Sequence, residues 1–121
     1  MLNLDTHILI DALRGELSRG ERAALSSERW GISAIVLWEI AKLVQLKRVA
    51  LDLDGPEFAR ALSRIQVWPL DLAIFRASTQ LDFKSDPADE LISATSIVHA
   101  VPLVTRDRRI RRSRKVPLAR T

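Results

Sequence analysis

Short apolar runs alternate along the chain with longer segments in which apolar residues recur every three or four positions. The short runs predict buried strands, and the longer segments predict amphipathic helices. Strands are expected at residues 2–4, 30–33, 67–69, 102–105 and 115–118. Helices are expected at residues 6–13, 19–27, 34–46, 57–65, 72–81, 88–99 and 107–112. This alternation predicts an α/β fold with a parallel sheet covered by helices on both faces.

Residues that favour helix starts stand directly before several of the predicted helices. Ser33 and Asp71 can each accept a hydrogen bond from the free N–H groups of a first helical turn. Asp86 is followed by Pro87, and proline is favoured at the first position of a helix. No linker or internal repeat divides the 121 residues, a length that suits one core. We therefore expect a single domain over residues 1–121.

The composition narrows the class of protein. Hydrophobic residues make up 47% of the chain, which indicates a globular protein rather than a disordered one. No apolar run reaches the roughly 18 residues that a membrane-spanning helix needs, and the N-terminus lacks the basic start of a signal peptide. The absence of cysteine excludes disulfides, zinc–thiolate sites and thiol nucleophiles. These features predict a cytoplasmic protein that has no membrane partner.

Basic residues are concentrated near the C-terminal end of the chain. Residues 106–120 hold eight of the 19 basic residues and one acid, a balance of +7. The rest of the chain holds 11 basic and 14 acidic residues, a balance of −3. A basic end on an acidic body indicates a polyanionic partner that meets one region. A solvated charged tail explains the same run, so the charge alone does not choose between the two.

Carboxylates from separate segments fall where a parallel sheet forms its ligand site. Asp5 ends the first predicted strand, and Asp107 comes two residues after the strand at 102–105. Glu39 stands in the second turn of one predicted helix, and Asp89 stands in the first turn of another. Because parallel strands and the helices that follow them open toward one edge of the sheet, these side chains are expected to converge. Each acid also has an ordinary explanation as a helix cap, a first-turn acid or an exposed helical residue.

Converging carboxylates repel one another and raise each other's pKa values. A divalent cation removes that penalty, and an all-oxygen site in a chain without cysteine suits Mg²⁺ or Mn²⁺. The cation would also admit a phosphate group, lower the pKa of a bound water and stabilise the charge formed during attack on a phosphodiester. The joint placement of the acids therefore indicates metal-dependent phosphodiester hydrolysis.

Four segments of the chain, in order, resemble the motifs of the PIN domain family. They are LDTHILID, ISAIVLWEIAKL, DPADELISATSI and PLVTRDRRI, and together they span nearly the whole chain. The likeness is greatest to the VapC-type toxins of bacterial toxin–antitoxin pairs. It implies a three-layer α/β/α sandwich around a short parallel sheet, and an endoribonuclease that depends on Mg²⁺ or Mn²⁺.

The resemblance also implies roles for individual residues. The positions that match the family's catalytic acids are Asp5, Glu39, Asp89 and Asp107. Of these, Asp5, Asp89 and Asp107 are expected to bind the metal ion. Thr6 and Thr105 match hydroxyl positions that orient the acids or a metal-bound water.

Three partners are expected from the same resemblance. RNA would be drawn toward the acids by the basic segment, whose candidate contacts are Arg106, Arg108, Arg109, Arg111 and Arg112. A cognate antitoxin would insert an Arg into the acidic groove, because Arg pairs bidentately with carboxylates. A second copy of the chain would complete a homodimer.

The third motif departs from the family pattern. This branch reads His-x-Asp-Pro-Phe-Asp-Arg, whereas the present chain reads Lys-Ser-Asp-Pro-Ala-Asp-Glu at residues 84–90. Glu90 reverses a positive charge beside Asp89, which predicts weaker attraction of phosphate or an altered metal site. The reversal keeps open a second hypothesis, a non-catalytic module that binds nucleic acid or a partner. A phosphatase of the haloacid dehalogenase type is disfavoured, because it needs an acid two residues after Asp5, where His7 stands.

Overall fold

The computed structural model describes all residues, 1–121, and contains one parallel sheet. Its strands are β1 (Leu2–Leu4), β2 (Trp30–Ser33), β3 (Gln66–Trp68) and β4 (Leu103–Val104), in the spatial order β3-β2-β1-β4. Asn3 of β1 pairs with Gly31 on one side and with Leu103 on the other. The predicted parallel α/β fold is therefore confirmed.

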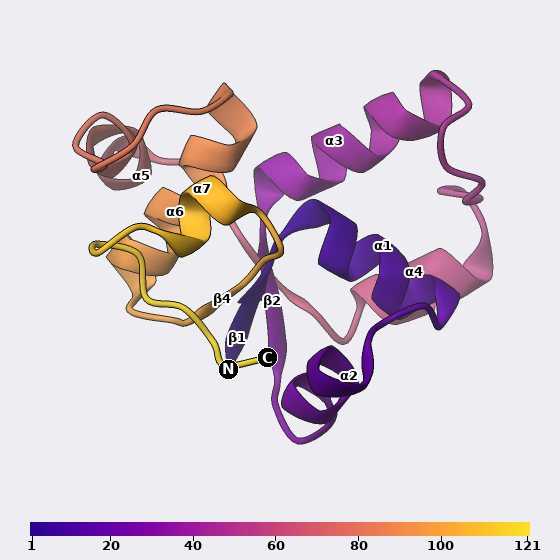
Figure 1. Cartoon of the computed structure of the whole chain (residues 1–121). Coiled ribbons are helices and arrows are strands. Elements are labelled where there is room, and N and C mark those ends of the chain that lie inside the picture. Colours follow the sequence, from indigo (N-terminus) through magenta and orange to yellow (C-terminus); the bar gives the residue numbers. More distant parts are fainter.

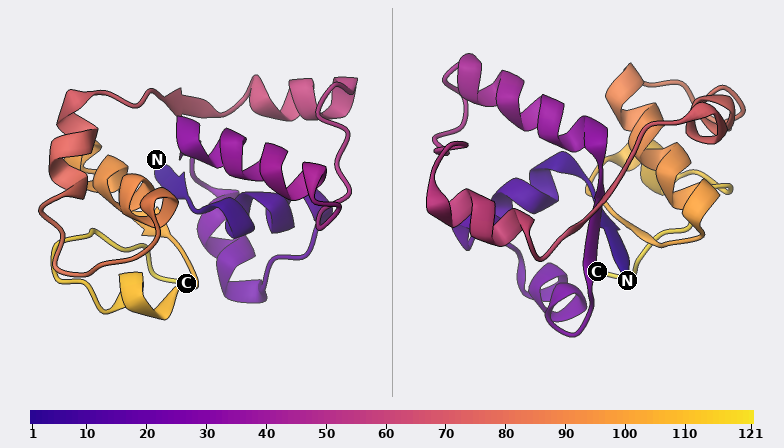
Figure 2. Two further views of the ribbon diagram at one scale, coloured as in Figure 1. Left: turned by 90° about the horizontal axis from the view of Figure 1, so that it is seen from above. Right: turned by 180° about the vertical axis from the view of Figure 1, so that it is seen from behind.

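Helices cover both faces of the sheet, as Figures 1 and 2 show. One side carries α1 (Thr6–Arg14), α2 (Arg19–Ser26), α3 (Ala34–Gln45) and α4 (Pro56–Leu62). The other side carries α5 (Leu72–Ser78), α6 (Pro87–His99) and α7 (Arg108–Arg111). The result is the three-layer α/β/α sandwich that was expected. No helix combines the length and the apolar character needed to cross a membrane.

The core lies on both faces of the central strands. Leu4 and Ile32 point into it from β1 and β2, and each is 0% exposed. Ile40 of α3 and Ile92 of α6 pack against the strands in the same cluster. Burial on both faces explains why the strands are unbroken apolar runs. Asn3 is the polar exception in β1, and its amide donates hydrogen bonds to α6.

The predicted helix caps are present. The Ser33 hydroxyl accepts a hydrogen bond from the Ile35 N–H at the start of α3. The Asp71 and Asp86 carboxylates do the same for α5 and α6. These contacts satisfy N–H groups that have no partner inside the helix, which is why the helices begin where the sequence indicates.

Several predicted boundaries are wrong; the helix expected at 57–65, for example, ends at Leu62. The expected strand at 115–118 is reduced to one isolated bridge between Leu118 and Leu103. The Ser113 hydroxyl accepts hydrogen bonds from the N–H groups of residues 115 and 116, and proline at 117 has no N–H, so this segment cannot form a ladder. Helix α5 ends at Ser78 rather than at residue 81, because the Ser78 and Thr79 hydroxyls bond to backbone carbonyls three residues earlier.

The order of the strands fixes the place of a ligand site. The chain passes from β1 to β2 and then to β3 in one direction, and it returns to place β4 on the other side of β1. The order therefore reverses between β1 and β4. In open parallel sheets, ligands bind beyond the carboxyl ends of the strands at such a reversal.

Candidate active site

An acidic cavity of about 470 Å³ lies beyond the carboxyl end of β1 and receives residues from the segment after β4. Six of the ten residues that line it are acidic; the ten are Asp5, Thr6, His7, Ile8, Asp11, Glu39, Asp86, Asp89, Arg106 and Asp107. The four acids expected from the sequence are thus brought to one cavity, together with two further acids. Thr6 also lines the cavity.

Asp5 stands between β1 and α1 and is 8% exposed. One carboxylate oxygen accepts a hydrogen bond from the Thr6 N–H at 2.8 Å, and the other accepts one from the Thr105 hydroxyl at 2.6 Å. Burial raises the pKa of Asp5, while these two hydrogen bonds act in the opposite direction. Asp5 is therefore both a helix cap and a cavity residue, so the two explanations offered for it do not exclude each other.

Glu39 reaches the cavity from the second turn of α3. The Thr6 hydroxyl donates a hydrogen bond to its carboxylate, which connects α1 to α3 beside Asp5. Glu39 is half-buried, and this burial raises its pKa; the nearby charges of Asp5 and Asp86 act in the same direction. Thr6 thus contacts one of the four acids, and its supporting role in the site stays a prediction.

Asp89 lies in the first turn of α6, and the Ser85 hydroxyl donates a hydrogen bond to it at 2.9 Å. Burial, with the charges of Asp86, Asp5 and Asp107, raises the pKa of Asp89 to about 6. Sequence reasoning did not single out Ser85. The available signal was a hydroxyl residue directly before the Asp-Pro helix start, where a side chain can reach back over the first turn.

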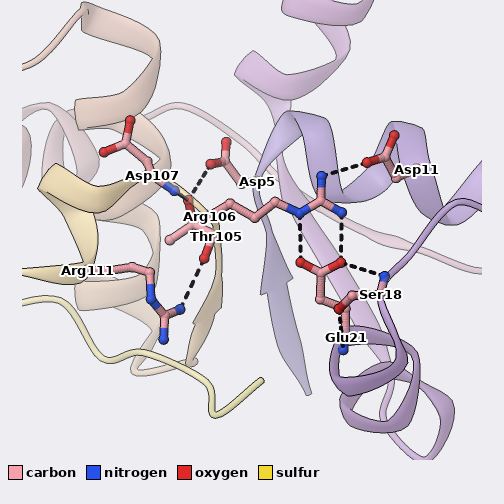
Figure 3. A network of polar contacts seen from close by, with 8 residues as sticks. All are labelled: Asp5, Asp11, Ser18, Glu21, Thr105, Arg106, Asp107 and Arg111. Carbon is pink, nitrogen blue, oxygen red and sulfur yellow. Dashed lines mark hydrogen bonds and ion pairs between the residues drawn. The ribbon is translucent and has the colours of Figure 1, made fainter.

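Asp107 caps the short helix α7 by accepting a hydrogen bond from the Ile110 N–H at 3.0 Å. Its own N–H donates to the Thr105 hydroxyl at 3.1 Å, and the same hydroxyl donates to Asp5. Thr105 therefore links the two acids across the reversal point, as Figure 3 shows. Thr105 thus contacts both Asp5 and Asp107, and its supporting role in the site stays a prediction.

The cavity is not a finished metal cage, because no group of three or more Asp, Glu or His side chains is arranged to hold an ion. Mg²⁺ seldom uses such cages; it binds one or two carboxylates and keeps several waters and substrate phosphate oxygens. The donor set fits that mode of binding, since it consists of carboxylates and hydroxyls. Burial and mutual repulsion make the charged forms of Asp5, Glu39 and Asp89 unfavourable and so raise their pKa values. A bound cation would offset this cost by favouring the charged forms.

The sequence agrees with known proteins over nearly its whole length. Residues 3–116 match the PIN domain. The chain is 30% identical over 118 residues to ribonuclease VapC22 of Mycobacterium tuberculosis, and the match covers 92% of this chain and 90% of that protein. The chain belongs to the PIN domain family. The similarity to VapC22 places it with the VapC-type members.

Solved structures share the fold of this chain. The structure of VapBC2 from Rickettsia felis, bound to a DNA fragment from its promoter, matches with a TM-score of 0.76 at 20% identity over 98% of both chains. A toxin–antitoxin complex from Klebsiella pneumoniae matches with a TM-score of 0.67 at 25% identity, covering 88% of this chain and 87% of that one. The fold of this PIN domain is therefore shared along almost its full length.

Arg106 of this PIN domain is partly exposed, and its guanidinium is bound by acids of the same chain. Its guanidinium donates two hydrogen bonds to Glu21 of α2, each 2.7 Å long, and a third to Asp11 of α1 at 2.6 Å (Figure 3). Arg106 lowers the pKa of Glu21 to about 2, and the two carboxylates raise the pKa of Arg106. The sequence led us to expect Arg106 at the RNA, whereas here three of its five N–H groups bond to two acids that were not predicted.

The other arginines of the basic segment form no ion pairs. Arg109 donates a hydrogen bond to the Lys84 carbonyl, and Arg111 donates one to the Thr105 carbonyl. Arg108 and Arg112 are exposed and line a second cavity together with Arg109. The Asp82 carboxylate lines the same cavity without forming an ion pair with any of these arginines.

Glu90, which departs from the PIN motif, does not line the acidic cavity. Its carboxylate accepts a hydrogen bond of 3.3 Å from the Ser85 N–H. Glu90 therefore stabilises the turn that carries Ser85, and Ser85 in turn contacts Asp89. The reversal of charge acts on the turn before α6 rather than inside the cavity.

Proposed function

We propose that this chain is the toxin of a toxin–antitoxin pair and that it hydrolyses phosphodiester bonds in RNA with Mg²⁺ or Mn²⁺. The observation that carries the proposal is the gathering of Asp5, Glu39, Asp89 and Asp107 around one cavity at the strand reversal of a PIN domain. A relative that is 30% identical over most of the chain is named a ribonuclease, which favours RNA as the substrate.

Each acid has a distinct place in this proposal. Asp5, Asp89 and Asp107 would hold the ion, and Glu39 would complete the site or position water. When bound, such an ion lowers the pKa of water and stabilises the negative charge that develops on the phosphate. The hydroxyl of Thr105 keeps Asp5 in place by a hydrogen bond. Hydrolysis would leave a 5′-phosphate and a 3′-hydroxyl.

RNA would approach along the basic segment. Phosphate contacts give most of the sequence-independent affinity of such proteins, and Arg side chains provide them. The exposed Arg108 and Arg112, with Arg109 and Arg111 beside them, would bind the phosphates on the way to the acids.

An apolar cavity next to the acidic one suits an antitoxin segment. It is lined by Ile35, Trp38, Pro87 and Ala88, and it shares Glu39 and Asp86 with the acidic cavity. Trp38 is 57% exposed there. A peptide with an Arg next to apolar residues would pair its charge with the acids and cover the Trp38 ring.

The test is cleavage of single-stranded RNA in Mn²⁺ by the wild type and by Asp5→Asn. Asn is as good a helix cap as Asp, so the fold should survive while the charge is lost. We expect activity to fall at least about 100-fold, since even partners outside the first shell of a metal cost 10–100-fold. Asp54→Asn, which removes an exposed acid outside the cavity, is the matched control.

The same variants decide between the enzyme and the binding module. Equal RNA cleavage by the wild type and Asp5→Asn would overturn the role of Asp5. RNA binding without cleavage, unaffected by neutralising both Asp5 and Asp107, would support the non-catalytic module. Expression of the wild type in bacterial cells should arrest growth, and Asp5→Asn should not.

A further inference from the structure

Arg106 occupies the position between two residues of the acidic site, in the segment that follows β4. Its neighbours are Thr105, whose hydroxyl contacts Asp5, and Asp107, which caps α7. The Arg106 side chain points away from Asp107 toward α1 and α2 (Figure 3). The backbone that sets the direction of Asp107 is therefore tied to these helices through one side chain.

Glu21, which accepts two of the Arg106 hydrogen bonds, is itself held in place. The Glu21 side chain is 7% exposed, and its carboxylate accepts a hydrogen bond of 2.9 Å from the Ser18 N–H. The Ser18 hydroxyl accepts one from the Glu21 N–H, which completes a capping box at the start of α2. A planar guanidinium that bonds a carboxylate through two parallel N–H groups also fixes direction as well as distance.

The segment is held from the opposite side as well. The Arg111 guanidinium donates a hydrogen bond of 3.1 Å to the Thr105 carbonyl. The Asp107 N–H donates to the Thr105 hydroxyl. With Arg106 bound to α1 and α2 and Arg111 bound to the Thr105 carbonyl, the segment 105–107 is held at two points, and little freedom remains for Asp107.

We propose that Arg106 is a positioning residue, which, through Glu21 and Asp11, holds Asp107 and Thr105 in the geometry that the active site needs. It does not bind the phosphates of RNA. This inference rests on the proposed ribonuclease function, because it assigns a role within that same site. It also gives α2, which contributes no residue to the cavity lining, a function in the reaction.

Glu21→Gln separates positioning from RNA contact, because the two roles predict opposite results. Gln keeps the size of the side chain but cannot form the charged bidentate pair. If Arg106 contacted RNA, this change would release it and lower the KM for RNA. If Arg106 positions Asp107, kcat should fall about 10-fold and the Kd for Mn²⁺ should rise by a similar factor, as for partners outside the first shell of a metal. The KM for RNA should then stay within about 2-fold.

A double-mutant cycle gives a second readout. Arg106→Gln should cost at least as much as Glu21→Gln, because it also removes the contact with Asp11, and the double variant should be no worse than Arg106→Gln alone. Glu16→Gln is the control, because it breaks the exposed Arg14–Glu16 pair at 3.3 Å and Glu16 does not line the cavity. If Glu21→Gln does not fold, Arg106→Lys replaces it, since Lys keeps the charge without the bidentate geometry.

Amide signals in ¹H–¹⁵N spectra measure the positioning effect without any RNA cleavage assay. Release of the tie should shift the signals of Thr105 and Asp107 and leave those of α4 unchanged. A wild type that cleaves RNA, with unchanged kcat and Mn²⁺ affinity in Glu21→Gln, would overturn the positioning role alone. A wild type that does not cleave RNA, with weaker Mn²⁺ binding and shifted signals in Glu21→Gln, would overturn the ribonuclease function and support the tie.

Discussion

Replacing Asp89 with asparagine should stabilise the protein at about pH 7.5 when divalent metal has been removed. The Asp89 pKa rises from 3.8 to about 6, mainly because the carboxylate is half-buried and three other acids lie near it. Above that pH the folded protein carries a charge that its environment disfavours. Asparagine has the same shape, accepts the Ser85 hydrogen bond, and carries no charge.

The size of the effect follows from the shift and from two terms that reduce it. A rise of about two pKa units corresponds to about 3 kcal/mol, and partial exposure of Asp89 screens this to about 1–2 kcal/mol. A negative charge in the first turn of α6 is stabilised by the helix dipole by about 0.3–1 kcal/mol, which the substitution removes. The net expectation is a gain of about 1 kcal/mol, or about 3–5 °C in Tm for a chain of this length.

The difference in stability between the wild type and Asp89→Asn should depend on pH. The folded state binds its proton more tightly than the unfolded state, so the penalty is absent below about pH 3.8 and complete above about pH 6. Wild type and Asp89→Asn should therefore be equally stable at about pH 3.8 and diverge as the pH rises to about 7. Thermal unfolding in EDTA, followed by circular dichroism at each pH, measures this difference. Mn²⁺ should then raise the Tm of the wild type more than that of the variant.

A lower Tm for Asp89→Asn at about pH 7.5, or a difference that does not change with pH, would refute this reasoning. Asp54→Asn serves as the control at the same charge, because Asp54 is exposed and lies outside the cavity. It should change the free energy of unfolding by less than about 0.5 kcal/mol at every pH.

Other consequences can be measured with the same assays. Thr105→Val removes the hydrogen bond to buried Asp5 and should cost about 1–3 kcal/mol, more at high pH, where Asp5 is ionised. Gly31→Ala should cost about 1–3 kcal/mol, because a Cβ at this position would lie 2.3 Å from the Trp68 ring. Light scattering should give twice the chain mass of 13.6 kDa for the expected homodimer. A measured mass equal to that of one chain would contradict the homodimer.

The sequence predicted the order of elements and the approach of the acids, because both depend on local signals. Alternation of apolar runs with helical spacing is visible in the residues themselves. A cap residue such as Ser33 marks the start of a helix by a contact within three residues of itself. Once the strands are parallel, Asp5 must stand at the edge toward which the next helix opens. No knowledge of side-chain packing was needed for these steps.

Hydrogen bonds between side chains were not predictable in this way. Ser85 and Asp89 are four residues apart, yet their hydrogen bond depends on a turn whose path is set partly by Glu90. Glu21 and Arg106 are separated by 85 positions. Glu and Arg are usually exposed in proteins, so neither residue type indicated a contact with the other. The sequence therefore grouped Arg106 with its basic neighbours, although folding pairs it with α1 and α2.

This pairing has a consequence for the electrostatics of the site. No ion pair of the chain involves Asp5, Glu39, Asp89 or Asp107. Neutral hydroxyl groups hold three of these acids in place, so their orientation is fixed while their charge remains uncompensated. Arg106 lines the cavity but pairs with none of these four acids; had it done so, it would have neutralised them and opposed a cation. Because its charge is compensated by Glu21 and Asp11 instead, the cavity keeps the negative potential that attracts a divalent ion.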